Sequence, residues 1–274
     1  MATRSSTESL VQAIKATNPA QILVLTGAGV SLASGIPTFR GSDVEAIWKR
    51  NPMELGTREY FEEDPAGSWK WYMARYDLVR DAKPNPGHFA IAALERYQLG
   101  RGGDFLLITQ NIDTLHEKAG SQRMIKVHGT SDRLRCSRIG CQNGSPAGSL
   151  PIQEVDLAPF RADPVESNVP RCPVCKSFLR VHVLWFDEMY TEHRDYGWDD
   201  VCASVAHQAQ LVIVAGTSFS VGVTALMLRH CGGRRVPIFN IDPSPTVDNP
   251  RVQNIAAGSE VVLVDACREL GIDV

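Results

Sequence analysis

Four cysteines in the middle of the chain have the spacing of a metal site. Cys136 and Cys141 are separated by four residues, Cys172 and Cys175 by two, and 30 residues lie between the pairs. One pair alone could be redox-active. Two such pairs favour structural Zn²⁺, because a tetrahedral ion takes four thiolates and leaves no open position for catalysis. We therefore expect one structural zinc ion here.

A glycine-rich stretch, TGAGVSLASGIPTFRG (26–41), follows the apolar run QILVLT. A glycine turn between a strand and a helix lets backbone N–H groups approach a pyrophosphate at the helix N-terminus. The pattern is not G-x-G-x-x-G, because position 32 is Leu, and no acidic residue ends a next strand about 20 residues on. A hydride-transfer site is therefore disfavoured. A dinucleotide site for another chemistry, or a turn without a ligand, stays open.

Polar residues follow four further apolar runs. Ligands of open α/β sheets collect at the carboxyl ends of the strands, so polar residues at such ends are candidate ligand contacts. The four segments are TQNID (109–113), KVHG (126–129), GTS (216–218) and FNID (239–242). Any one of them could be a structural cap, but together with the glycine turn they indicate a single site.

The apolar runs themselves predict the sheet. They are continuous rather than alternating, as expected for strands covered on both faces. The predicted strands are 21–26, 105–109, 124–128, 211–218, 236–241 and 261–264. Amphipathic stretches such as TESLVQAIKAT and GHFAIAALERYQ predict helices between them. The predicted fold class is α/β, a Rossmann-like doubly wound parallel sheet.

Two segments interrupt this pattern. Residues 43–82 are aromatic and charged and predict a helical excursion. Residues 135–180 hold the four cysteines, have little periodicity and predict a small zinc-binding domain. The remainder, 1–42, 83–134 and 181–274, is assigned to the Rossmann-like domain.

Composition limits the partners. The 274 residues carry a net charge of −3, with 43% hydrophobic and 22% charged residues. This gives no electrostatic reason to expect nucleic acid or an anionic membrane as a partner. No apolar run approaches the ~20 residues of a membrane span, and the start MATRSSTESL lacks a hydrophobic signal core. We expect a cytoplasmic protein, or a mitochondrial or nuclear one in a eukaryotic cell.

In order and spacing, the glycine stretch, TQNID, the HG at 128–129, GTS, FNID and the four cysteines resemble the sirtuin family over residues 9–267. The resemblance implies a Rossmann-like large domain and a zinc-binding small domain. It also implies NAD-dependent removal of acyl groups from protein lysines, with NAD consumed to give nicotinamide and O-acyl-ADP-ribose. The expected partners are acylated lysines of substrate proteins, and we expect a monomer.

The resemblance also implies a set of NAD contacts. Those near the diphosphate, the nicotinamide and its ribose are Gly27, Ala28, Gly29, Phe39, Arg40, Gln110, Asn111, Ile112 and Asp113. Those on the diphosphate and adenosine side are Gly216, Thr217, Ser218, Asn240, Asp242 and Ala257. The implied catalytic residues are His128, as the general base that deprotonates a ribose hydroxyl, and Asn111.

A Y-x-x-R pair bears on the acyl group. Tyr72 and Arg75 match a pair in class III sirtuins, which remove succinyl, malonyl and glutaryl groups, and Gly56 resembles a position kept small there. A guanidinium can pair bidentately with the distal carboxylate of such a group. On composition alone, Arg75 could equally be a solvated helix residue, and the pair does not exclude deacetylation.

The segment HVLWFDE (182–188) resembles the strand against which the substrate peptide lies, with Val183, Trp185 and Phe186 as contacts. Two other functions remain open. An ADP-ribosyltransferase or NAD hydrolase would use the same NAD residues, but it needs no carboxylate clamp. A non-catalytic NAD sensor or zinc interaction module would be indicated by changes at Asn111, Asp113 or His128, and none is changed.

Overall fold

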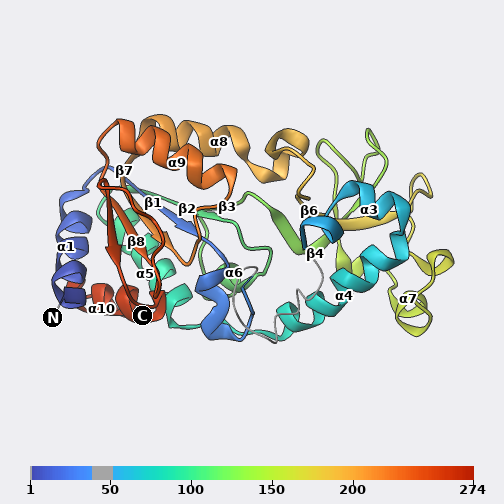
Figure 1. The fold of residues 1–274 in the computed structure, drawn as a ribbon, viewed down its shortest axis with the longest axis horizontal. Coiled ribbons are helices and arrows are strands. Elements are labelled where there is room, and N and C mark those ends of the chain that lie inside the picture. Colours follow the sequence, from blue (N-terminus) through green and yellow to red (C-terminus); the bar gives the residue numbers. More distant parts are fainter. Residues whose placement is uncertain (1, 39–51) are drawn as a thin grey trace.

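The computed structural model describes residues 2–38 and 52–274, so the predicted site residues Phe39 and Arg40 lie outside the described residues. The molecule has two lobes (Figure 1). One holds a six-stranded sheet between helices, and the other holds a small sheet with α3 (Arg58–Glu63), α4 (Pro65–Asp81) and α7 (Ala158–Ala162) beside it. No helix in the described part of the chain combines the length and apolarity of a membrane span.

The large sheet is entirely parallel. Its strands, in spatial order, are β3 (Met124–Lys126), β2 (Asp104–Thr109), β1 (Gln21–Thr26), β7 (Ala209–Ala215), β8 (Ile238–Ile241) and β9 (Val252–Ile255). The predicted doubly wound sheet is confirmed. Strand order reverses between β1 and β7, where sheets of this type open a crevice for ligands at their carboxyl ends.

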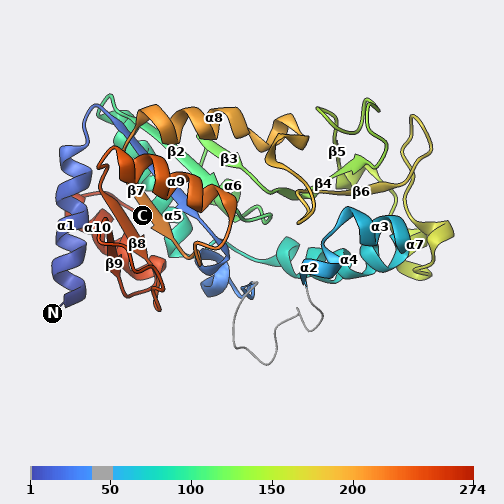
Figure 2. The same cartoon turned by 45° about the horizontal axis from the view of Figure 1, so that its top comes forward.

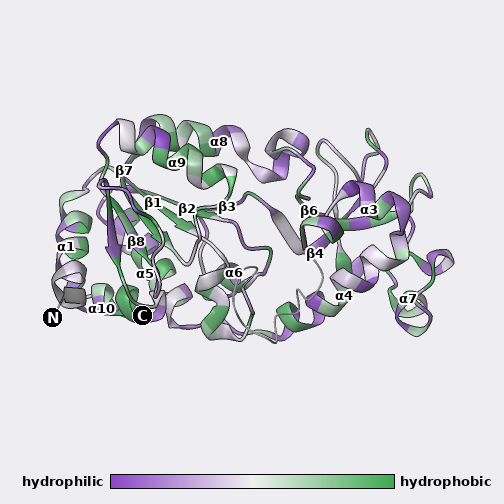
Figure 3. Ribbon diagram, in the orientation of Figure 1, coloured by the Kyte–Doolittle hydropathy of each residue, from purple (hydrophilic) through white to green (hydrophobic). Residues whose placement is uncertain are grey.

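Helices cover both faces of this sheet (Figure 2). On one face, α1 (Ala2–Ala16), α5 (Pro86–Gly100) and α10 (Ser259–Leu270) pack their apolar side chains on β1, β2 and β7. On the other, α8 (Trp198–Ala203), the π-helical turn Ser204–Gln208 and α9 (Gly222–Gly233) do the same. All six β1 residues are buried, which explains the continuous apolar runs in the sequence (Figure 3).

One predicted strand is wrong. The run VVLV (261–264) lies in α10, where Val262 and Leu263 are buried and Val261 is 52% exposed. The last strand is instead β9, whose two central residues, Gln253 and Asn254, are exposed because it lies at the edge of the sheet. Their polarity removed the apolar signal. The predicted strand 124–128 ends earlier, at Lys126.

The small lobe is built on an antiparallel sheet in the order β5 (Leu150–Pro151), β4 (Gly129–Cys136), β6 (Leu179–Val183). It extends beyond both ends of the range 135–180 predicted for the zinc domain. The described part of the predicted excursion is helical. The remaining helices are α2 (Pro52–Leu55), α3 (Arg58–Glu63), α4 (Pro65–Asp81), α6 (Leu115–Ala119) and α7 (Ala158–Ala162).

A buried carboxylate holds the small lobe together. Glu188 accepts hydrogen bonds from Arg180 at 2.6 Å, Arg135 at 3.0 Å, Arg58 at 2.9 Å and the Trp185 amide at 3.0 Å. Burial raises the pKa of Glu188, but Arg180 and Arg135 outweigh this effect and bring it to about 2. One side chain therefore joins α3, β4, β6 and the turn that follows β6.

We predict that Glu188→Gln lowers the free energy of unfolding by about 3–5 kcal/mol, because it leaves two buried guanidinium groups without their counter-charge. Urea unfolding at pH 7 measures the loss. Glu192→Gln is the matched control, since Glu192 also contacts Arg58, at 3.3 Å, but is partly exposed. It should cost less than about 1 kcal/mol. Equal losses in the two variants would contradict the central role of Glu188.

Candidate active site

The loops after β1 and β7 touch where the strand order reverses. Gly27 donates its amide to Ala215 O at 3.0 Å, and Gly29 donates to Gly216 O at 2.9 Å. A Cβ on Gly29 would lie 2.7 Å from Gly216 Cα, and one on Gly27 would lie 2.7 Å from Gly216 O. Gly216 has φ +61°, in the left-handed region. The glycines are thus required for this loop contact.

This contact changes the expected use of the glycine turn. The sequence predicts that its amides face a pyrophosphate, but those of Gly27 and Gly29 are already bonded to the β7 loop. The helix that follows is a 3₁₀ helix, Ala28–Ser34. The two glycines therefore bring the ends of β1 and β7 together, and we call this contact of Gly27 and Gly29 with residues 215–216 the glycine floor.

Asn111 and Asp113 form a buried hub on this floor. Asn111 Nδ2 donates to Gly27 O at 3.1 Å and to Ser31 Oγ at 3.2 Å. Ser31 Oγ in turn donates to Asp113 Oδ2 at 2.9 Å, and Asp113 Oδ1 accepts from the Leu115 amide at 3.0 Å. Sequence reasoning missed Ser31. It lies inside the quoted glycine stretch, but only its contacts show that it links two predicted NAD residues.

A hollow that is partly open to solvent lies beside the hub. Its lining residues are Ala28, Ser31, Ile36, Pro37, Arg75, Leu78, Val79, Asn111, Ile112 and Asp113. The structure thus brings four of the predicted NAD contacts together with Arg75 of α4.

His128 follows β3 and is half-buried. Its Nδ1 lies 2.9 Å from Gln110 O, and a carbonyl only accepts, so we assign the proton to Nδ1 and the lone pair to Nε2. Burial lowers the pKa of His128 to about 4, against the weaker effect of the Gln110 carbonyl. At neutral pH the imidazole is therefore uncharged, and Nε2 can accept a proton.

The hydroxyl of Tyr190 makes a hydrogen bond to that lone pair. This hydroxyl lies 3.2 Å from His128 Nε2 and must be the donor. The phenol ring stacks on Trp198, with centroids 4.1 Å apart and planes 10° apart. Sequence reasoning missed Tyr190, because it lies 62 residues from His128 and belongs to no motif.

The remaining predicted NAD residues lie at the carboxyl ends of β2, β7, β8 and β9. Gln110 Nε2 donates to Thr217 Oγ1 at 3.2 Å, and Ser218 is exposed. Asn240 is buried, and its Nδ2 donates to Asn254 Oδ1 at 2.8 Å. Asp242 accepts from the Ser244 amide at 2.8 Å. Ala257, after β9, is half-buried.

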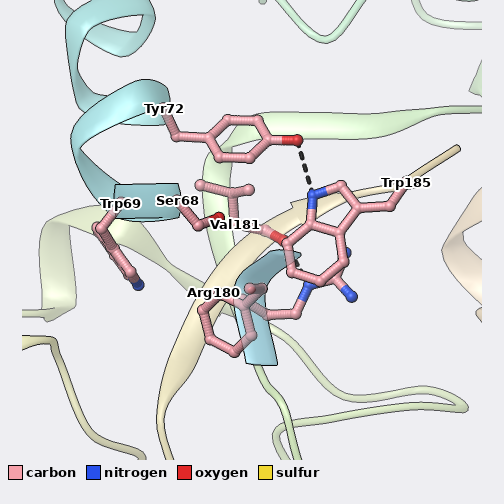
Figure 4. Close-up of a pocket in the computed structure, with 7 residues that line it drawn as sticks. Ser68, Trp69, Tyr72, Arg180, Val181 and Trp185 are labelled. Atoms are coloured by element: carbon pink, nitrogen blue, oxygen red, sulfur yellow. Dashed lines mark hydrogen bonds between the residues drawn. The ribbon is translucent and has the colours of Figure 1, made fainter. Parts of the chain in front are cut away.

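Tyr72 and Arg75 do not line the same hollow. The Tyr72 hydroxyl accepts from Trp185 Nε1 at 2.7 Å in a packed contact between α4 and the turn after β6 (Figure 4). Arg75 lies one turn along α4, lines the hollow, and places its guanidinium 3.8 Å above the Trp71 ring. It donates to Trp71 O at 2.5 Å. Burial lowers the pKa of Arg75 to about 10.

Most of the predicted contact residues of the peptide-binding segment are buried inside the protein. Val183 and Trp185 are buried, whereas the Phe186 side chain is 47% exposed. The Phe186 amide donates to Gly56 O at 2.9 Å. This places the predicted small residue Gly56 directly beside the segment. Of the three predicted contacts, only Phe186 presents a large part of its side chain to solvent.

The four cysteines converge in the small lobe. Cys136 Sγ lies 3.3 Å from Cys175 Sγ, Cys141 Sγ lies 3.7 Å from Cys172 Sγ, and all four sulfurs lie within 4.8 Å of one another. Zn–S bonds of about 2.3 Å in a tetrahedron place sulfurs about 3.8 Å apart. The donor set and its size fit a structural zinc ion.

Comparison with known proteins agrees with this geometry. Residues 27–223 match the model of the Sir2 family. An NAD-dependent protein deacylase of Thermus thermophilus is 39% identical over 231 residues, which cover 84% of this chain and 82% of that protein. NAD-dependent protein deacylase 1 of Archaeoglobus fulgidus is 40% identical over 234 residues, 84% of each chain.

Solved structures are similar over almost the whole chain. A Sir2 homologue in complex with ADP-ribose superposes with a TM-score of 0.80 at 35% identity and covers 96% of both chains. A Sir2 homologue in complex with NAD gives a TM-score of 0.77 at 34% identity, over 96% of this chain and 93% of the other. Together with the glycine floor, the Asn111 hub and the cysteine cluster, these matches show that the chain belongs to the Sir2 family, the sirtuins.

Proposed function

We propose that this protein is an NAD-dependent protein-lysine deacylase that prefers acidic acyl groups: succinyl, malonyl and glutaryl. The observation that carries the activity is the state of His128, an uncharged imidazole whose Nε2 lone pair is set by Gln110 O beside the crevice. The names of the similar deacylases support the same reaction. The glycine floor and the hub fit NAD as the co-substrate, as in the similar structure with NAD.

In the proposed reaction, Asn111 positions the nicotinamide ribose, because its side chain is held by Gly27 and Ser31. His128 accepts the proton of a ribose hydroxyl at Nε2. For this to happen, the Tyr190 hydroxyl must yield its place on Nε2 or pass the proton on. In this reaction the acyl oxygen of the substrate would first displace nicotinamide from C1′ of the ribose. The deprotonated hydroxyl would then attack the acyl carbon, the lysine amine would leave, and one water would complete O-acyl-ADP-ribose.

Arg75 carries the proposed acyl preference. It lines the same hollow as Asn111 and Asp113, and burial penalises its charge, so a carboxylate in the hollow would gain from pairing with it. Tyr72 is engaged with Trp185 and would act through that contact, by fixing α4 against the peptide segment. We assign the carboxylate contact to Arg75 and a positioning role to Tyr72.

The conformation of Arg75 also supports an alternative function, a deacetylase that does not prefer acidic acyl groups. The Arg75 guanidinium is folded back on Trp71 and bonds to its carbonyl. In that case the hollow would serve a short acyl group, and Arg75 would stabilise α4. An NAD hydrolase or ADP-ribosyltransferase would release nicotinamide without freeing lysine.

The first prediction for the active site compares Arg75→Met with wild type on one peptide that carries either succinyl-lysine or acetyl-lysine. Loss of a charged hydrogen-bonded pair costs about 1.5–3 kcal/mol, so kcat/KM on succinyl-lysine should fall about 10–100-fold. Turnover of acetyl-lysine should hold or rise. Arg80→Met is the control, because Arg80 lies on the same helix but pairs at the surface with Asp77 and Asp81.

A wild-type preference for acetyl-lysine that Arg75→Met leaves unchanged would contradict the acidic-acyl assignment and leave a deacetylase. Nicotinamide release without free lysine from either peptide would instead move the assignment to hydrolysis or ADP-ribosyl transfer.

The second prediction concerns the base. His128→Tyr should keep the fold and lose about 10²–10⁴-fold in turnover, the usual value of general base catalysis. Tyr190→Phe removes the donor that favours the neutral imidazole, so the pKa of His128 should rise. The acidic limb of kcat/KM against pH should then move to higher pH. Turnover at pH 5 should fall more than turnover at pH 8. An unshifted limb would mean that Tyr190 leaves Nε2 before the proton transfer.

A further inference from the structure

A second group of side chains of the types that bind metals, separate from the four cysteines, lies in the small lobe. His182 is in β6, and His193 and Asp195 are in the chain that follows it. His182 Nε2 lies 3.2 Å from Asp195 Oδ2, and His193 Nδ1 lies 3.7 Å from the same oxygen. The three ligand atoms lie within 4.8 Å of one another.

The protonation of the His193 ring suits a metal ligand. Its side chain is buried, and its Nε2 lies 3.1 Å from Gly148 O, which can only accept. The proton is therefore on Nε2, and the Nδ1 lone pair points toward Asp195. Metal-bound histidines usually donate their other N–H to a carbonyl or carboxylate in this way. At present Nδ1 accepts from the Asp195 amide at 3.2 Å, so a metal would share or replace this bond.

His182 is the second candidate ligand. It is 1% exposed, and among the described residues neither of its ring nitrogens makes a well-aligned hydrogen bond. An unsatisfied buried polar group costs about 1–3 kcal/mol, so such groups usually have a partner that has to be identified. Its Nε2 faces Asp195 and the Nδ1 side of His193.

We propose that His182, His193 and Asp195 bind one divalent transition-metal ion, with Zn²⁺ as the first candidate. Zn²⁺ bonds of about 2.0–2.2 Å to nitrogen and oxygen place tetrahedral ligands about 3.3–3.6 Å apart, close to the two distances observed here. Two imidazoles and a carboxylate suit zinc and its first-row neighbours. Asp195 is partly exposed, which leaves a route for entry and room for a water as fourth ligand.

The proposed site lies between the loop that follows Cys141 and the strand that begins at Gly129. The Gly148 contact and the bond from the Arg194 amide to Pro146 O, 2.8 Å, attach the loop that follows Cys141 to this segment. On its other side, the carbonyl of His182 lies against Gly129, the neighbour of His128. A bound ion would therefore fix both the zinc-cluster loop and the strand beside the predicted base.

The test is metal content after saturation with zinc and removal of free ion. We expect two zinc ions per chain in the wild type and one in Asp195→Asn and in His182→Asn. Ser149→Ala should keep two. Ser149 is the matched control, because its hydroxyl touches Asp195 at 3.3 Å but is not a proposed ligand.

Cobalt loading of the wild type gives a readout that needs no variant. The first equivalent should fill the cysteine cluster and show thiolate-to-cobalt charge transfer. The second should add visible d–d absorption without further charge transfer, because its ligands are nitrogen and oxygen. One ion per chain in the wild type, or a second equivalent that adds no d–d band, would overturn the proposal. The 3.2 Å contact between His182 Nε2 and Asp195 Oδ2 would then be a hydrogen bond, with the proton on the imidazole.

Discussion

The contact between the glycine loops after β1 and β7 is the constraint on which the rest of the site depends. Gly27, Gly29 and Gly216 approach so closely that any side chain would collide with the opposite backbone. This approach joins the ends of β1 and β7 at the reversal of strand order. It also places Gly27 O where Asn111 can bond to it, which brings in Ser31 and Asp113. An alanine at any of the three glycines would therefore separate the loops before it disturbed a ligand directly.

The second lobe is positioned by charge rather than by close backbone contact. Glu188 binds Arg58, Arg135 and Arg180 in a buried network, and the predicted peptide-binding segment 182–188 ends at this residue. The α4 helix packs on the same sheet through Trp69, which donates to Leu179 O at 2.8 Å, and reaches back to the hollow through Arg75. The hollow thus combines Asn111 and Asp113 of one lobe with Arg75 of the other, the residue to which we assign the proposed acyl preference.

Most of the large sheet could be predicted, because parallel strands buried on both faces leave continuous apolar runs. The exceptions are at its edge. Gln253 and Asn254 made β9 polar, and the apolar face of α10 resembled a strand. Local motifs included four residues that line the hollow: Ala28, Asn111, Ile112 and Asp113. Tyr190 could not be found this way, because its role depends on a contact across 62 residues. Tyr72 matched a family pattern, but its hydroxyl is committed to Trp185.

Because Tyr190 stacks on Trp198, the fluorescence of Trp198 can report on the surroundings of the predicted base, His128. The two rings lie nearly parallel at 4.1 Å, and the phenol on one side of the stack touches His128. Indole emission responds to a neighbouring ring and to local polarity. Any ligand that displaces Tyr190 from His128 must therefore alter the emission of Trp198. The chain has five tryptophans, but among the described ones only Trp198 stacks on Tyr190. The protein thus carries an intrinsic fluorophore two side chains away from the proposed proton transfer.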